Sequence, residues 1–298
     1  MAGIDLNRTS TNVGALLPKE ISSEIWSTAV EESVVMRAAR RINLPGSGLT
    51  IPIITGDAEA DWVAETDEKP VSDVAISSKS MTGYKLAVIE TFSDEFRRDL
   101  PALYAELARR LPSALGRKFD ETVLHGTAPG SNFDVLSGSA SVAVDATDTV
   151  GDLVGALSTI GTAGGDLSHW LLSPQAEGLV MTAKDAAGNY ALLRDVQAST
   201  GAIGSLFGRP VVKSRAVYNN PATGADTIGF AGDFANSAIY GVVEDVRVKI
   251  SDTATVNKNG TQLNLWQRNM FAVLAEIEVG FVVRNGAHFV KLTGATTA

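Results

Sequence analysis

The chain has 298 residues and a mass of 31.2 kDa, with 45% hydrophobic and 20% charged residues. This length allows one large domain or two moderate ones, and the composition is that of an ordinary globular protein. The absence of cysteine excludes disulfide scaffolds, cysteine zinc sites and thiol catalysis. The formal net charge of −9 argues against a dedicated nucleic-acid-binding protein, because phosphate binding depends on cationic side chains.

The N-terminal region predicts an arm followed by a helix. Residues 1–16 are small and polar without periodicity, which is typical of a flexible terminal segment. Pro18 then stands at a first helical position, and apolar side chains recur at helical spacing up to Val34, followed by arginines. We therefore expect a helix over 18–41, ended by the turn cluster Pro45-Gly46-Ser47-Gly48.

The pattern changes between residues 50 and 90. Ile51 and Ile53 alternate at one end and Tyr84 to Val88 alternate at the other, so both ends predict strands. The stretch from Gly56 to Gly83 is mostly charged and small, with too few large apolar residues for a core of its own. We expect a projecting β-ribbon that depends on a neighbouring subunit, because an isolated two-stranded ribbon is only marginally stable.

A long apolar stripe predicts one helix that ends near Leu124. Ser93 is a suitable cap for the start of this region, and Pro112 is expected to kink the helix because it lies in the interior. Gly126 is suited to terminate it. The stripe consists of Leu100, Leu103, Leu107, Leu111, Leu115 and Phe119.

Strands and helices alternate after this helix. Thr149 and Asp152 have the spacing of a capping box at the start of a helix. Trp170–Leu172 predicts a short buried strand, and Pro174 opens another helix.

Strands dominate the C-terminal part. Apolar side chains occupy every second position from Phe271 to Val283 without a break, which is long for one strand and predicts the spine of a sheet. Asn285-Gly286 then matches the dipeptide of a tight hairpin, leading into residues 289–292.

The sequence contains none of the common catalytic motifs. A phosphate-binding loop, G-x-G-x-x-G, G-x-S-x-G and H-E-x-x-H are all absent. His125, His169 and His288 lack metal-ligand spacing, so we assign them structural roles. We therefore predict no enzyme activity and no catalytic, cofactor-binding or metal-binding residue.

The densest group of carboxylates lies in the ribbon segment. It comprises Asp57, Glu59, Asp61, Glu65, Asp67 and Glu68. Four of them match ligand positions of a calcium loop, but Trp62 occupies the place where that loop needs glycine. Two interpretations remain open: a solvated, charged tip, or a patch that contacts arginines of another subunit. Exposed Trp62 and Val63 would support a contact, since Trp is a common interface anchor. Candidate arginines are Arg97, Arg98, Arg109 and Arg110.

Several segments in a fixed order carry a resemblance to a known family. They are Asp61-Trp62-Val63-Ala64-Glu65, Ser93–Arg98 with the helix to Gly126, Phe207-Gly208-Arg209-Pro210-Val211, Gly232-Asp233-Phe234 and Phe271–Phe281. Together they resemble the major capsid proteins of tailed bacteriophages, the family with the HK97 fold. The specificity lies in their order and spacing over residues 18–292, since no single motif is distinctive.

The resemblance implies an α+β, HK97-like fold in four parts. These are an N-terminal arm with a helix (1–49), an extended β-ribbon loop (50–89), a peripheral domain with a long spine helix (90–133 and 241–285) and an axial domain (134–240). Residues 286–298 are a candidate final strand of the axial domain.

The implied function is structural: a subunit of an icosahedral virion capsid, forming pentamers and hexamers around double-stranded DNA that it encloses without specific binding. The resemblance further implies assembly in the bacterial cytoplasm, with a separate scaffolding protein, a portal, candidate decoration proteins and no membrane. Some family members join a loop lysine to a neighbour's asparagine. Lys69, Lys79 and Lys85 are candidate lysines, but the acceptor has no match here, so we assign no cross-link.

Two alternatives remain. An encapsulin-like nanocompartment shell shares this fold and holds cargo enzymes instead of DNA, so nucleic acid inside purified particles would separate the two. An uncharacterised enzyme is the distant alternative, and particles of uniform size would argue against it.

Overall fold

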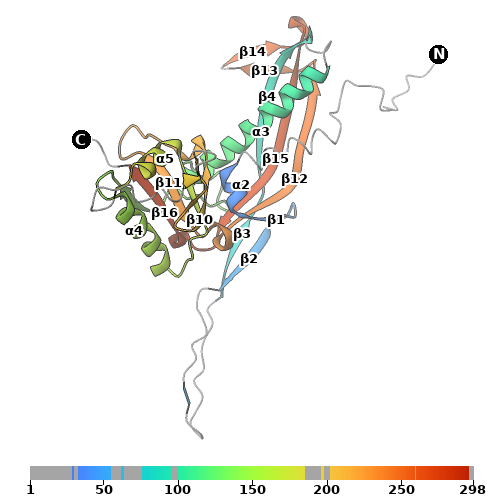
Figure 1. Cartoon of the computed structure of the whole chain (residues 1–298). Helices are drawn as coiled ribbons and strands as arrows, with labels where there is room; N and C mark the ends of the chain where they lie inside the picture. Colours follow the sequence, from blue (N-terminus) through green and yellow to red (C-terminus); the bar gives the residue numbers. More distant parts are fainter. Residues whose placement is uncertain are drawn as a thin grey trace, which may run out of the picture.

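The computed structural model describes residues 29, 33–54, 62–63, 76–95, 100–184, 196–197, 202–258 and 260–294. Most of the described strands belong to two sheets. Figure 1 shows a long four-stranded sheet on one side and a compact six-stranded sheet with its helices on the other. Helices and strands are mixed along the chain, as the predicted α+β class requires.

The four-stranded sheet has the strand order β1-β12-β15-β4. Its strands are β1 (Arg40–Asn43), β4 (Tyr84–Ser93), β12 (Ala238–Ser251) and β15 (Met270–Val283). β15 pairs antiparallel with both β12 and β4, whereas β1 runs parallel to β12. The 14-residue β15 therefore has a partner on each edge, which confirms the strand and the spine predicted from the alternation.

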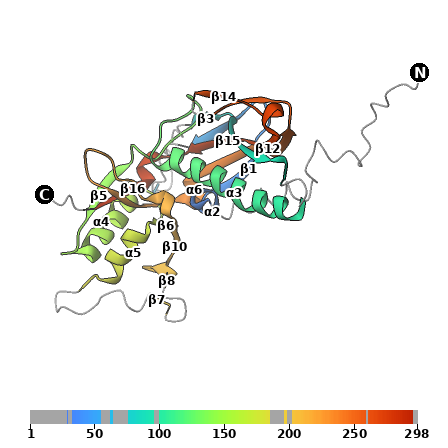
Figure 2. The ribbon, with the colours of Figure 1, turned by 90° about the horizontal axis from the view of Figure 1, so that it is seen from above.

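Helix α3 (Leu100–Leu124) lies along the four-stranded sheet and contains Pro112 in its interior (Figures 1 and 2). Leu111 and Phe119 are buried in one core with the strand residues, and the ring of Phe119 meets Phe281 edge to face at 6.2 Å. The apolar stripe is confirmed over this half of the helix. The side chains before residue 110 lie outside the described part.

The six-stranded sheet has the order β5-β16-β11-β6-β10-β9. Its strands are β5 (Ala140–Val144), β6 (His169–Leu172), β9 (Ser205–Leu206), β10 (Arg209–Lys213), β11 (Thr227–Gly232) and β16 (Phe289–Gly294). Helices α4 (Thr149–Thr162) and α5 (Pro174–Met181) pack with it around a second core that contains Trp170. The indole Nε1–H of Trp170 donates to the Leu206 carbonyl at 3.1 Å, so this buried ring is also satisfied as a donor.

Smaller elements complete the described part. Three strand pairs are formed by β2 (Leu49–Ile54) with β3 (Ile76–Met81), β7 (Val196–Gln197) with β8 (Ala202–Ile203), and β13 (Thr255–Lys258) with β14 (Thr261–Asn264). The short helices are α2 (Val34–Ala38), α6 (Phe234–Ser237) and the 3₁₀ turns η3 (Arg215–Val217), η4 (Trp266–Arg268) and η5 (Gly286–His288). Among the described residues, no helix has both the length and the hydropathy to cross a membrane.

The predicted helix over 18–41 ends earlier than expected. α2 ends at Ala38, and Arg40 lies in β1, where it pairs with Ile239 of β12. The helix ends here because the backbone N–H and C=O groups of the next residues form hydrogen bonds with β12 instead. Of the residues expected in this helix before Ser33, only Ala29 is described, and it is helical.

The ribbon has a different second strand from the predicted one. β2 pairs with β3, from Leu49 opposite Met81 to Ile54 opposite Ile76. The stretch around Tyr84 instead begins β4 and joins β15. The serines of β3 gave no apolar alternation, and so periodicity alone pointed to the later strand.

Two local turn predictions are also wrong. The cap of α4 is Asp148, whose carboxylate accepts from the Gly151 N–H at 3.1 Å, and Thr149 is the first helical residue. Asn285 has φ −139° and is the N-cap of η5, whereas a tight hairpin needs positive φ there. The chain therefore crosses to the other sheet, where β16 pairs with β11 and β5.

The buried face of α3 supports a stability prediction. Leu111→Ala removes a side chain that is 1% exposed and should lower the free energy of unfolding by about 2–5 kcal/mol, measured by urea denaturation of the purified subunit. Leu157→Ala, the same change at a 39% exposed position of α4, is the control and should have a much smaller effect. An equal loss of unfolding free energy in the two variants would mean that α3 does not cover the core.

Candidate functional site

A buried carboxylate holds the N-terminal segment against α3. Asp120 is 1% exposed, and its oxygens accept from the Ser33 hydroxyl at 2.6 Å and from the backbone N–H groups of Val34 and Val35 at 2.9 and 3.2 Å. These N–H groups belong to the first turn of α2, which has no helical partner for them. Asp120 therefore caps a helix that is distant in sequence and fixes its position on α3.

Burial in this contact changes the pKa of the Asp120 carboxyl group. Burial raises the pKa of the carboxyl group to about 6, while the bonds from Ser33, Val34 and Val35 act in the opposite direction. Desolvation outweighs the three donors because the group is almost completely removed from water. The three donors favour the ionised carboxylate, but burial outweighs them, so ionisation of Asp120 makes the folded state less favourable overall.

Close approach at this junction depends on Gly116. A Cβ atom at that position would lie 3.1 Å from the Ala29 carbonyl oxygen and 3.4 Å from the Ser33 nitrogen. A side chain there would require the Ala29 carbonyl group to shift by a few tenths of an ångström. The absence of a side chain at Gly116 therefore allows Ala29 and Ser33 to lie close to α3.

A second polar contact fixes the base of the ribbon. The Lys79 ammonium of β3 donates to Asp134 at 2.7 Å and to the Val283 carbonyl at 2.9 Å. The same oxygen of Asp134 accepts from the Val283 N–H at 2.8 Å. The ribbon is thereby attached to the end of β15 and to the chain that follows α3.

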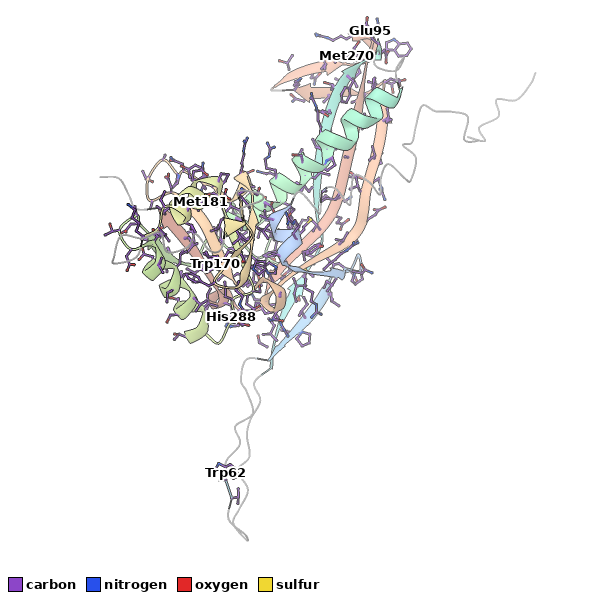
Figure 3. The ribbon with its side chains drawn as sticks, in the orientation of Figure 1. Trp62, Glu95, Trp170, Met181, Met270 and His288 are labelled. Atoms are coloured by element: carbon purple, nitrogen blue, oxygen red, sulfur yellow. The ribbon has the colours of Figure 1, made fainter. Side chains whose placement is uncertain are left out.

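The ribbon segment carries a fully exposed indole. Trp62 is 100% exposed and Val63 is 39% exposed. Figure 3 places Trp62 far from the two sheets of its own subunit. The exposure that the sequence analysis expected for this pair is therefore present.

A second exposed indole lies in η4, just before β15. Trp266 is 72% exposed, whereas its neighbour Leu265 is fully buried. The N–H groups of Arg268 and Met270 both donate to the Leu265 carbonyl, and Asn269 adopts the left-handed conformation at φ 51°. This tight turn presents Trp266 outward on a fixed backbone.

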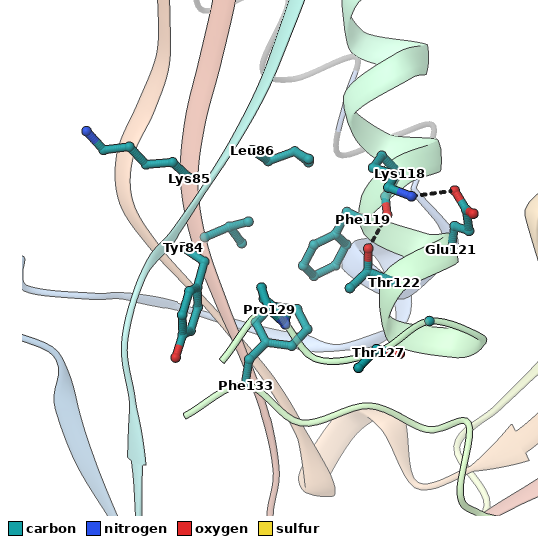
Figure 4. A pocket seen from close by; sticks show the side chains of 12 residues that line it. Tyr84, Lys85, Leu86, Lys118, Phe119, Glu121, Thr122, Thr127, Pro129 and Phe133 are labelled. Carbon is teal, nitrogen blue, oxygen red and sulfur yellow. Dashed lines mark hydrogen bonds and ion pairs between the residues drawn. The ribbon is translucent and has the colours of Figure 1, made fainter. Parts of the chain in front are cut away.

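An apolar hollow of about 300 Å³ lies between α3, β4 and the loop after α3 (Figure 4). The aromatic rings of Tyr84, Phe119 and Phe133 line it, and Tyr84 meets Phe133 edge to face at 5.9 Å. Lys118 and Glu121 form an ion pair of 3.1 Å on its rim. The packed rings join the loop to both α3 and β4.

The three histidines have separate partners. His125 Nε2 donates to the Ala216 carbonyl, and burial lowers the pKa of this ring. His288 lies 2.7 Å from the Ser237 hydroxyl, and His169 bonds to Ser168. Within the described ranges, no group of three or more His, Cys, Asp or Glu residues could hold a metal ion.

Two sets of sequence-predicted residues fall largely outside the described part. The carboxylates that match calcium-ligand positions, Asp57, Glu59, Asp61 and Glu68, all lie there, as do Arg97 and Arg98. Of the three candidate cross-linking lysines, Lys69 also lies outside the described residues. Lys79 forms an ion pair with Asp134, and Lys85 is exposed on β4.

Comparison with known proteins identifies the family. The model of the phage capsid family matches residues 13–294. The chain belongs to the phage capsid family. The probable major capsid protein of Mycobacterium phage L5 is 30% identical, covering 93% of this chain and 89% of that protein. Its counterpart in Mycobacterium phage D29 is 29% identical over 94% and 91%. A solved structure from Mycobacterium phage Adephagia has a TM-score of 0.71 at 24% identity, covering 89% of this chain and 91% of the other.

These findings confirm the predicted HK97-like capsid fold and the structural role. The chain is a major capsid protein, a virion component that assembles into a phage capsid. The relatives are phage capsid proteins, so the comparisons favour a viral shell over an encapsulin-like nanocompartment. The exposed and anchored segments are therefore candidate assembly surfaces of this capsid protein.

Sequence reasoning missed the anchors of this capsid subunit. Asp120 follows Phe119, the last residue of the apolar stripe, and its burial could not be inferred because adjacent helix positions point in different directions. Ser33 is a good N-cap residue, but it was placed in the interior of one continuous predicted helix. No local pattern pairs Lys79 with Asp134, which is 55 residues away.

The raised pKa of Asp120 gives a pH prediction. The folded carboxyl group binds its proton more tightly than the unfolded one, so its contribution to stability is complete below its ordinary value of 3.8 and is lost as pH rises through about 6. The difference in unfolding free energy between the natural subunit and Asp120→Asn should fall by roughly 2–3 kcal/mol from about pH 4 to about pH 7. Denaturant titrations at several pH values measure it. A difference that is constant or grows with pH would contradict the burial argument.

The Lys79 contact predicts a local effect. Lys79→Met should speed amide exchange in β3 while lowering the free energy of unfolding by only about 0–1 kcal/mol, because the ion pair is partly exposed. Hydrogen exchange with mass spectrometry measures the amide exchange in β3, and denaturant titration measures the free energy of unfolding. Lys85→Met on β4 is the matched control, and equal exchange in β3 for both variants would show that Lys79 does not anchor the ribbon.

Proposed function

We propose that this chain forms pentamers and hexamers that tile an icosahedral shell around double-stranded DNA. The observation that carries the proposal is the fully exposed Trp62 on a segment whose base is fixed to the body by Lys79. Large exposed aromatic side chains are typical of protein interfaces. Membership of the phage capsid family supports neighbouring subunits as the partners.

The two sheets support a division into the expected domains. We assign α3 and most of the four-stranded sheet to a peripheral domain, over 90–133 and 241–285, and the six-stranded sheet to an axial domain, over 134–240. Strand β1 and the first part of β4 join the four-stranded sheet from the ranges of the arm and the extended loop. In this proposal β16, within 286–298, completes the axial domain, since it pairs with β11 and β5. Residues 1–49 form the arm with its helix and 50–89 the extended loop.

The charge of the chain fits a container for DNA. With a net charge of −9, the wall lacks the cationic excess that tight phosphate binding needs. DNA is then enclosed without specific contacts, and packing and release are not opposed by the wall. Assembly takes place in the bacterial cytoplasm, with a separate scaffolding protein, a portal and candidate decoration proteins as further partners.

Microscopy of the expressed protein tests the proposed function. Negative-stain images should show particles of uniform size with icosahedral outlines, and particles from infected cells should contain double-stranded DNA. A soluble 31.2 kDa monomer under all assembly conditions would contradict the proposal. Uniform particles filled with a cargo protein and free of nucleic acid would instead support a nanocompartment.

The two indoles Trp62 and Trp170 separate assembly from folding. Trp62→Ala should leave the melting temperature of the subunit nearly unchanged and reduce the yield of shells, because the indole is fully exposed. Trp170→Ala, at a fully buried position, should lower the free energy of unfolding by about 3–5 kcal/mol. Calorimetry and particle counts measure the contrast. If Trp62→Ala destabilises the subunit as much as Trp170→Ala, Trp62 is a core residue.

A further inference from the structure

A polar cleft lies between the middle of α3 and η3. Its volume is about 430 Å³, and its lining includes Ser113 and Arg117 from α3 and Ser214 and Arg215 at η3. Helix α3 shares a core with the four-stranded sheet, whereas η3 follows β10 of the six-stranded sheet. The cleft therefore has one wall from each half of the subunit.

No described residue neutralises the two arginines of the cleft. Arg117 and Arg215 are both exposed, and neither forms an ion pair with another described residue. Asp120 also lines the cleft, but its oxygens accept from Ser33 and from the first turn of α2. An arginine in contact with Asp120 would lower the pKa of this carboxyl group, whereas burial raises it to about 6. Asp120 is therefore not the counter-ion of either guanidinium group.

Two positive charges that line one cleft favour an anionic ligand. Like charges around the same space repel each other, and an anion between them removes this repulsion. A guanidinium group stays charged and donates two parallel hydrogen bonds to a single anionic group. The Ser214 hydroxyl accepts from the Ala216 N–H at 3.2 Å, which leaves its own O–H to donate. The cleft therefore offers donors from both of its walls.

The arrangement of these donors favours phosphate over carboxylate. The oxygens of a tetrahedral phosphate point in several directions, so one group can accept from two guanidinium groups and a hydroxyl group, whereas a carboxylate presents two oxygens in one plane. Arginine and serine side chains are common partners of nucleic-acid phosphates, and such contacts carry no sequence information. The net charge of −9 limits the chain to local contacts of this kind.

We propose that the cleft between Arg117 and Arg215 binds one phosphate group, which bridges α3 and η3. The group comes from the backbone of a nucleic acid or from free phosphate, since both present the same oxygens to the arginines. The nucleic-acid source rests on the proposed enclosure of DNA, whereas the free-phosphate source does not. A bound phosphate stabilises the folded subunit, because a ligand that binds only the folded state shifts the unfolding equilibrium.

Thermal unfolding of the full-length protein in inorganic phosphate tests the site. Phosphate should raise the melting temperature of the natural protein by several degrees above its value in chloride at equal ionic strength. The cleft variant, Arg117→Gln with Arg215→Gln, should fold normally because both positions are exposed, and should lose most of this increase. The control variant, Arg37→Gln with Arg284→Gln, removes the same charge at two exposed arginines outside the lining. It retains any general effect of phosphate on stability.

A labelled double-stranded oligonucleotide distinguishes the two sources of phosphate. If backbone phosphate occupies the cleft, the cleft variant should bind the duplex at least about tenfold more weakly at low salt, and the slope of log affinity against log salt should fall by about 2. Fluorescence anisotropy measures both quantities. Duplex binding equal to that of the control variant, together with a lost response to inorganic phosphate, would assign the cleft to free phosphate.

Several results would overturn the proposal. The cleft variant and the natural protein would then respond equally to phosphate and bind the duplex equally, or the control variant would lose as much as the cleft variant. Stronger protection of the natural protein by poly-glutamate than by phosphate would make the cleft a carboxylate site. Binding is measured whether or not shells form. Shells without phosphate binding mean that only this site fails, and phosphate binding without shells means that the proposed function fails while the site stands.

Discussion

Strand β15 pairs along nearly its whole length with two neighbours, from Met270 opposite Ser93 of β4 to Val283 opposite Ala238 of β12. This double pairing satisfies the backbone groups of a very long strand and brings together segments from three distant parts of the chain. Phe271, Val273 and Phe281 of β15 are fully buried, and the core they form extends to α2 and α3. The position of α3, and with it every contact that Asp120 makes, depends on this strand.

The parts of the fold that follow from local pattern were predictable. The alternation over 271–283 requires a strand, and the apolar stripe of α3 requires a helix with a buried face. The errors arose where long-range pairing outweighed local signals. Arg40 is compatible with a helix, but β12 offers it a sheet ladder. Asn285-Gly286 favours a hairpin, but β16 gains two partners in the other sheet.

The candidate site was predictable only in part, for the same reason. An exposed Trp62 among carboxylates could be inferred from composition, because the segment around it holds too few large apolar residues for a core of its own. The contacts of Lys79 with Asp134 and Val283 join residues 55 and 204 positions apart. Hydrophobic periodicity cannot predict contacts between residues so far apart in sequence, and these contacts are therefore seen only in the folded structure.

Asp134, in the loop after α3, forms hydrogen bonds to both β15 and β3. Its N–H donates to Phe281, and its carboxylate accepts from Val283 and Lys79. Immediately after Val283 the chain leaves one sheet and enters the other. A mechanical load carried along the ribbon is therefore delivered at the point where both sheets are joined. The ribbon then acts as a lever on the whole subunit, and tension between neighbours in a shell is shared by two cores.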